Sequence, residues 1–128
     1  MYRLARIYGF QAAPGEAAVF LDRLYPRGIR KETMSRFVWL KDLTPSAALR
    51  EWYHQDPDSR FAEFARRYRA ELAAPERQAA LEELRRIHAG HPATVLLSAV
   101  KNPEHSHLSV LRDHLLALEG SLKNGSGA

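Results

Sequence analysis

Two short runs of the chain are apolar with almost no interruption, and they predict the centre of a β-sheet. The runs cover residues 17–21 and residues 94–100. A strand with one solvated face alternates apolar and polar side chains, whereas a strand buried on both faces is apolar throughout. We therefore expect these runs to be adjacent parallel strands at the centre of the sheet.

Two weaker patterns predict further strands. Residues 3–8 roughly alternate between apolar and polar, which is typical of an edge strand, and residues 36–40 form a short apolar stretch. A turn at residues 13–16 separates the first of these strands from the run at 17–21. Because this link is too short for a helical crossover, we expect the two to pair as an antiparallel hairpin.

Elsewhere apolar side chains recur at intervals of three and four, the spacing of amphipathic helices. The start signals predict four helices, beginning at Thr44-Pro45, at Asp56-Pro57, at Pro75 and at Asn102-Pro103. The helix from Pro75 is expected to end at Gly90. Together these elements predict an α/β fold with a small mixed, mainly parallel sheet of about four strands that helices cover on both sides.

Length and composition favour one domain over residues 1–122 and a flexible tail over residues 123–128. The chain has 128 residues, 45% of them apolar, and no cysteine, so disulfides, thiolate zinc sites and cysteine nucleophiles are excluded. No apolar run approaches the roughly 20 residues that span a bilayer, and the N-terminus lacks a signal-peptide core. We expect a cytoplasmic protein without a membrane contact; the sequence leaves its oligomeric state open.

The net charge of +4 is concentrated locally in two places. One basic cluster consists of Arg23, Arg27, Arg30, Lys31 and Arg36, and the other of Arg60, Arg66, Arg67 and Arg69. Either cluster could bind phosphate or nucleic acid, or could be ordinary solvated surface.

Each buried strand continues directly into a polar segment, residues 22–28 after the first and residues 101–107 after the second. If the strands are parallel, both segments emerge at the carboxyl edge of the sheet, where open α/β folds bind ligands. A helix that began near Pro103 would add backbone N–H donors there. Together with the nearby basic side chains, this favours a ligand that carries phosphate or carboxylate.

The candidate residues divide by role. Ligand binding is assigned to Arg23, Arg27 and Lys101. Catalytic candidates, for an enzyme that transfers a proton, are Asp22, Glu104 and His107. The alternative for the arginines is a structural ion pair with Asp22 that fastens the loop to the end of the sheet.

Histidines raise the question of a metal site. On a helix His105 and His107 would not face each other, because residues two apart lie on different faces. His54 falls at a helix end, where packing or carbonyl capping is its usual role. We predict no metal and no cofactor. The chain also lacks a G-x-G-x-x-G motif, a P-loop, H-E-x-x-H and a serine elbow.

From Asp-Arg-Leu-Tyr-Pro-Arg-Gly at residues 22–28 onward, the chain resembles the YeaO-like family of small bacterial proteins, a domain of unknown function. The resemblance continues through residues 39–46, Leu49-Arg50, Trp52-Tyr53, Asp56-Pro57, Phe61, Phe64, Arg67-Tyr68, Glu71-Leu72, residues 94–97, Lys101, His107 and Leu111. It implies a compact α/β domain without an established activity. The family usually has tryptophan at Tyr25, histidine at Gln55 and asparagine at Ser106; His107 matches. The change at Gln55 leaves open whether His54 takes over that histidine's place.

Two classes of function remain open. The first is an enzyme or small-molecule binder with an anionic ligand at the carboxyl edge. The second is a nucleic-acid or protein interaction module that uses the basic loop over residues 23–36. No helix rich in base-reading side chains is evident, so nucleic-acid binding is expected to be weak and independent of sequence.

Overall fold

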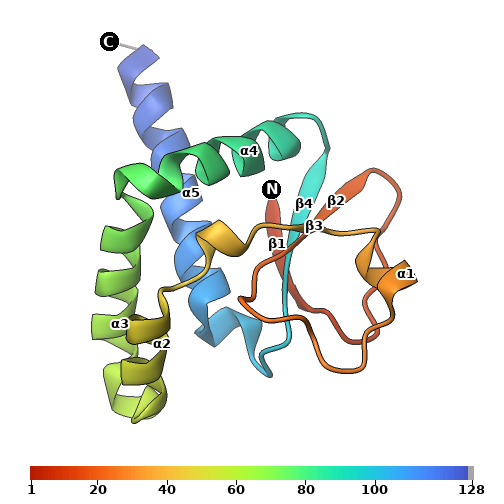
Figure 1. Cartoon of the computed structure of the whole chain (residues 1–128). Helices are drawn as coiled ribbons and strands as arrows, with labels where there is room; N and C mark the ends of the chain where they lie inside the picture. The colour runs from red at the N-terminus through yellow and green to blue at the C-terminus, as the bar shows by residue number, and fades with distance from the viewer. Residues whose placement is uncertain (127–128) are drawn as a thin grey trace.

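The computed structural model contains one four-stranded sheet in which all strands are parallel (Figure 1). The strands are β1 (Tyr2–Arg6), β2 (Glu16–Phe20), β3 (Val38–Trp39) and β4 (Ala93–Ser98), in the spatial order β1-β4-β2-β3. The apolar runs thus form the two central strands, as predicted. They pair over the full length of β2, from Glu16 opposite Ala93 to Phe20 opposite Leu97.

The predicted antiparallel hairpin is wrong. Strand β1 pairs in parallel with β4, and β2 lies on the other side of β4. The link over residues 7–15 contains no helix, yet it returns the chain to the amino edge of the sheet. An extended chain gains roughly 3.3 Å per residue, so this link easily spans a five-residue strand. Ile7, which is 1% exposed, holds its start against the sheet.

Four long helices lie on one face of the sheet: α2 (Ala47–His54), α3 (Pro57–Leu72), α4 (Gln78–Ala89) and α5 (His107–Ser126). Their apolar stripes form the main core with the side chains of β2 and β4 that point the same way, among them Val19 and Leu96. The other face carries a smaller core around Phe20 and Leu97, covered by α1 (Lys31–Met34) and by loops. The expected helical cover is therefore complete on one face only.

Three helices begin later in the chain than predicted. Helix α2 begins after Ser46 rather than at Thr44-Pro45, because the Ser46 hydroxyl accepts a hydrogen bond from the amide of Leu49. Helix α5 begins at His107, since residues Pro103–His105 form the separate 3₁₀ turn η3. Helix α4 begins at Gln78 rather than at Pro75, since residues Pro75–Arg77 form the 3₁₀ turn η2. A further 3₁₀ turn, η1 (Lys41–Leu43), precedes α2. Helix α3 begins at Pro57 and α4 is followed by Gly90, as predicted.

The structure describes the backbone of residues 1–126 and the side chains of residues 1–120. The predicted tail over residues 123–128 lies outside the residues whose side chains are described. Within the described part of the chain, no helix has the length and apolar character that a membrane crossing requires.

Candidate functional site

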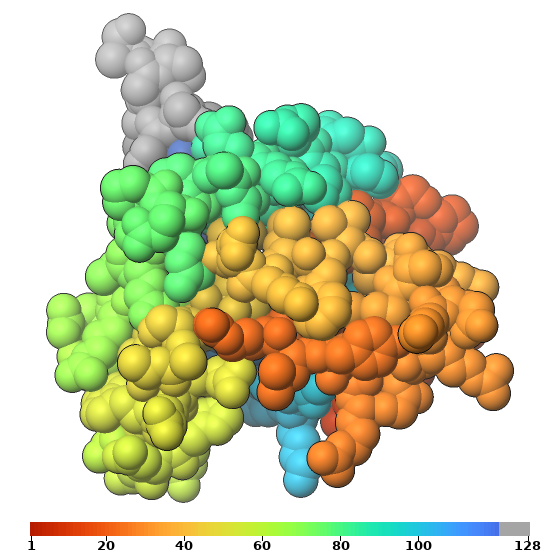
Figure 2. Space-filling model, in the orientation of Figure 1, coloured from red at the N-terminus to blue at the C-terminus, as the bar shows by residue number. Residues whose placement is uncertain are grey.

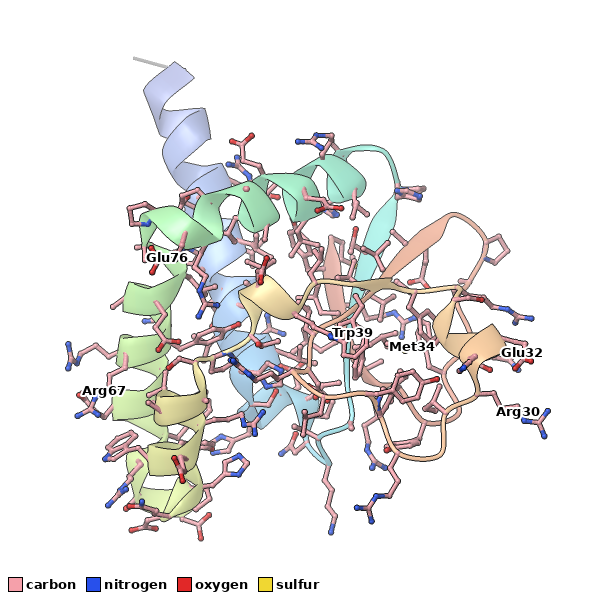
Figure 3. The ribbon with its side chains drawn as sticks, viewed as in Figure 1. Arg30, Glu32, Met34, Trp39, Arg67 and Glu76 are labelled. Carbon is pink, nitrogen blue, oxygen red and sulfur yellow. The ribbon has the colours of Figure 1, made fainter. Side chains whose placement is uncertain are left out.

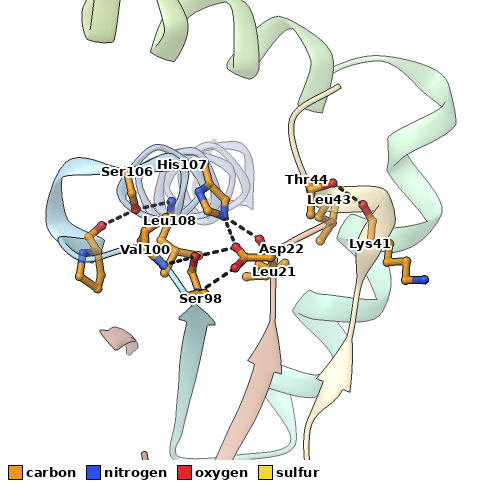
Figure 4. Close-up of polar contacts among 12 residues, drawn as sticks. Leu21, Asp22, Lys41, Leu43, Thr44, Ser98, Val100, Ser106, His107 and Leu108 are labelled. Atoms are coloured by element: carbon orange, nitrogen blue, oxygen red, sulfur yellow. Dashed lines mark hydrogen bonds and ion pairs between the residues drawn. The ribbon is translucent and has the colours of Figure 1, made fainter. Parts of the chain in front are cut away.

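The carboxylate of Asp22 joins the ends of the two central strands (Figure 4). Asp22 lies two residues after β2 ends, and its Oδ1 accepts a hydrogen bond of 2.6 Å from the hydroxyl of Ser98, the last residue of β4. Its Oδ2 accepts another, of 2.8 Å, from the backbone amide of Ala99. Asp22 therefore closes the gap where β2 and β4 diverge.

His107, the first residue of α5, completes this cluster. Its Nε2 lies 2.6 Å from the carbonyl oxygen of Leu21 and 3.2 Å from Oδ1 of Asp22. A carbonyl oxygen can only accept, so Nε2 carries a proton and donates it. We call Asp22, Ser98 and His107 the strand-end cluster. It ties β2, β4 and α5 together at one point.

The strand-end cluster keeps Asp22 ionised. Burial by itself would raise the pKa of Asp22, but hydrogen bonds from His107, Ser98 and the Ala99 amide outweigh burial and lower it. Asp22 is only one-fifth exposed and His107 one-eighth exposed. A carboxylate that is mostly buried and accepts three hydrogen bonds presents little surface to a further cation.

The chain leaves the central strands toward opposite faces of the sheet. After β2 it runs to the face that carries α1, and after β4 it runs to α5 on the helical face. Parallel α/β sheets bind ligands where neighbouring strands diverge in this way, outside their carboxyl ends. The strand-end cluster lies at this position. The segments that follow the two strands, orange and light blue, both project at the lower edge of the molecule (Figure 2).

The three basic residues predicted to bind a ligand lie in these segments. Arg23 follows Asp22 directly, Arg27 lies in the same loop, and Lys101 comes two residues after Ala99. All three are exposed. None of them makes an ion pair with any residue in the described part of the chain. The structure therefore does not contain the alternative, an ion pair between Asp22 and Arg23 or Arg27.

Glu104, the other acidic candidate, is also engaged elsewhere. Its carboxylate binds the guanidinium of Arg112 on α5, with Nη1 at 2.9 Å and 3.1 Å from its two oxygens. The structure thus brings Asp22 and His107 together and leaves Glu104 outside their hydrogen-bonded cluster.

The loop that carries Arg23 and Arg27 has a fixed shape. The indole N–H of Trp39 donates to the carbonyl of Asp22 at 2.7 Å, and the Tyr25 hydroxyl donates to the carbonyl of Ile29 at 2.7 Å. The rings of Tyr25 and Trp39 meet edge to face at 6.0 Å. Gly28 has a φ of +81°, a conformation that favours glycine. Two aromatic side chains and one glycine therefore hold the loop in place.

The remaining histidine candidates have separate surroundings. His105 stacks on Phe61 with ring centroids 4.0 Å apart, whereas His107 points to Leu21 and Asp22. His54 ends α2 and contacts the ring of Tyr53, and Gln55 accepts a hydrogen bond from Arg60. Across the described residues, no three histidine or acidic side chains gather as metal ligands would.

Sequence reasoning missed Ser98 and the role of Ser106. Ser98 interrupts the apolar run over residues 94–100, and a polar residue inside such a run is the signal that it faces a partner. Ser106 accepts a hydrogen bond from the amide of Leu108 and so caps α5. Asparagine, usual in the resembling family at this place, caps helices equally well.

Comparison with known proteins places the chain among small bacterial relatives. The family described as "Domain of unknown function DUF488" matches residues 3–115. Uncharacterized proteins of Mycobacterium bovis and Mycobacterium tuberculosis are each 41% identical over 109 residues, which is 85% of this chain and 88% of theirs. The uncharacterized protein YeaO of Escherichia coli is 39% identical over 100 residues, or 78% of this chain and 84% of its own. No solved structure gives a significant match. The strand-end cluster and its loop thus lie within the matched region, and the chain belongs to the YeaO-like DUF488 family.

Proposed function

We propose that the protein binds a small ligand bearing phosphate or carboxylate at the carboxyl edge of the sheet, through Arg23, Arg27 and Lys101. One observation carries the proposal: these three cations have no acidic partner in the described chain, while both neighbouring acids are already engaged. Asp22 is held by three donors and Glu104 by Arg112. An anion from solution supplies the missing charge, and guanidinium groups suit phosphate and carboxylate because they donate in parallel pairs.

The strand-end cluster has a supporting role in this proposal. It fixes the directions in which the two ligand-binding segments leave the sheet, since it joins Asp22 of one to Ser98 and Ala99 at the start of the other. If the protein is an enzyme, proton transfer at His107 uses Nδ1, because Nε2 is occupied by the carbonyl of Leu21.

Thermal unfolding with and without phosphate, at constant ionic strength, tests the proposal. We expect phosphate to raise the melting temperature of the parent protein, since a ligand at 100 times its Kd stabilises by about 2.7 kcal/mol. Arg27→Ala should keep the melting temperature of the parent in the absence of phosphate and lose most of the increase. Arg86→Ala is the matched control, because Arg86 is an exposed arginine of α4, at the opposite edge of the sheet. It should respond to phosphate as the parent does.

An equal phosphate response in the parent and in Arg27→Ala, or no response in either, would contradict the proposal. Titration with labelled duplex and single-stranded oligonucleotides at two salt concentrations separates the alternative function. Tight binding at physiological salt that is lost when Arg30 and Lys31 are replaced would favour an interaction module on the basic loop instead.

A further inference from the structure

A concave surface lies away from the strand-end cluster, beside the amino-terminal part of β2. It is a hollow of about 710 Å³, within the size range of small-molecule sites. The largest apolar side chains of its lining come from three separate places in the sequence: Phe10, Phe37 with Val38, and Ile87. Phe10 and Phe37 meet edge to face, with ring centroids 5.9 Å apart. Two aromatic rings and several aliphatic side chains therefore line the hollow.

The hollow exists because β3 is too short to cover β2. Strand β3 has two residues and pairs only with Val19 and Phe20. The preceding part of β2, Glu16 to Ala18, has β4 on one side and no strand on the other. Alanine at positions 17 and 18 adds little side-chain volume there. The side of β2 that β3 leaves uncovered is therefore open to the hollow over these residues.

The polar lining of the hollow offers a cation without a counter-charge. Its one acidic residue, Glu16, binds the guanidinium of Arg3 through two hydrogen bonds of 2.9 Å and 3.2 Å, and also accepts from the amide of Ala13. The hydrogen bond from Arg3 is the main reason that the pKa of Glu16 is lowered. Arg36 lines the same hollow and has no acidic partner among the described residues.

His91 adds a hydrogen-bonding group to the lining of the hollow. Its Nδ1 lies 2.7 Å from the carbonyl oxygen of Ile87 and therefore donates to it. This contact fixes the ring and leaves Nε2 for another partner. The hollow thus combines an apolar lining with one free guanidinium and one oriented imidazole.

We infer that this hollow binds a small amphipathic carboxylate, with its apolar body against Phe10, Phe37 and Val38 and its carboxylate on Arg36. The apolar lining selects a hydrocarbon or aromatic body. The guanidinium selects the acid, through a charge-assisted hydrogen bond that a neutral analogue cannot make. This site is separate from the proposed anion site at the carboxyl edge, and it requires none of Arg23, Arg27 and Lys101.

Nuclear magnetic resonance titration of the uniformly ¹⁵N-labelled chain tests the inference, with 4-phenylbutyrate as the probe. We expect saturable shifts of the amide signals of Phe10, Ala18, Val38 and His91. Arg36→Ala should weaken binding about tenfold or more, as the loss of one charge-assisted hydrogen bond implies. The neutral analogue 4-phenylbutan-1-ol should bind the parent more weakly by a similar factor.

Two further variants make the result specific. Ala18→Leu should abolish binding without a change of charge, because the larger side chain occupies the hollow. Arg30→Ala is the matched control, since Arg30 also flanks α1 but points away from the sheet (Figure 3). It should bind as the parent does. Shifts spread over unrelated surfaces, or equal affinity for the acid and the alcohol, would overturn the inference. Loss of binding in Arg23→Ala or Arg27→Ala but not in Arg36→Ala would also overturn it, because the probe would then bind at the carboxyl edge of the sheet.

Discussion

The polar residues that follow the central strands behave in two different ways within a few positions of each other. Asp22, two residues after β2, is mostly buried and its carboxylate binds Ser98, Ala99 and His107. Arg23 is the very next residue, and it is exposed and forms no ion pair with the described chain. The sequence alone presented both as members of one charged segment.

The difference separates the polar side chains at this edge that stabilise the fold from those that can bind a ligand. A polar group near a strand end must satisfy the main-chain groups that the diverging strands leave without partners. Asp22 and Ser98 do this, so they are used by the fold. The side chains farther along the loops have no such requirement, and they are the ones free to bind a ligand. Three predictions test this division.

The largest effect is expected in the core beneath the strand-end cluster. Leu96 is fully buried in β4, and Leu96→Ala should lower the free energy of unfolding by about 2–5 kcal/mol because it removes packed methyl groups and leaves a cavity. Urea unfolding measures the change. Leu116→Ala is the control, since Leu116 is 47% exposed on α5 and should change stability little. A loss below about 0.5 kcal/mol for Leu96→Ala would contradict the packing of β4 described above.

The next largest effect is expected at Asp22. Asp22→Ala leaves the Ser98 hydroxyl, the Ala99 amide and His107 without their shared acceptor and should cost about 3 kcal/mol. The pKa of Asp22 is lower in the folded protein than in the unfolded chain. Its contribution is therefore complete above the unfolded value of about 4 and is lost as the pH falls through the folded value.

Acid unfolding checks that expectation. The parent should lose stability below about pH 4, and Asp22→Ala should lose less over the same range. Asp42→Ala serves as the control because Asp42 is exposed in η1. The same acid response in the parent and in Asp22→Ala would mean that other carboxylates determine it.

The smallest effect is expected at the arginines of the loop. Arg23→Ala and Arg27→Ala should each change the free energy of unfolding by no more than about 0.5 kcal/mol, as is usual for exposed residues. Urea unfolding in a buffer without phosphate or sulfate is the measurement. A loss of 2 kcal/mol or more, about that of a buried hydrogen bond to a charged group, would assign these side chains to the fold and remove the contrast with Asp22.

The strand assignments show what hydrophobic pattern can and cannot predict. The apolar runs predicted the central strands correctly, because only a strand covered on both faces is apolar along its length. The same reasoning failed for the pairing of β1. The link over residues 7–15 is long enough either for a hairpin or for an extended return to the amino edge of the sheet. Ile7 and Phe10 pack on the face of the sheet that carries α1, and this packing favours the extended return.

The predicted start and stop signals marked some helix boundaries correctly and others not. Pro57 and Gly90 mark the helix ends as predicted. At α5 the proline signal opened a 3₁₀ turn instead, and Ser106 capped the helix three residues later. This displacement places His107 at the first position of α5, from which it reaches Leu21 and Asp22.

The sequence by itself determined the fold class, the central strands and the edge of the sheet where polar residues collect, since these follow from local periodicity and from which runs are apolar. Only the tertiary structure decided which of those residues meet. Hydrogen bonds between Asp22 and Ser98 or Ala99 join positions 76 and 77 residues apart, and that between Leu21 and His107 spans 86. No local pattern encodes such pairs. They depend on strand order and on where α5 begins, and the packing of the whole chain fixes both.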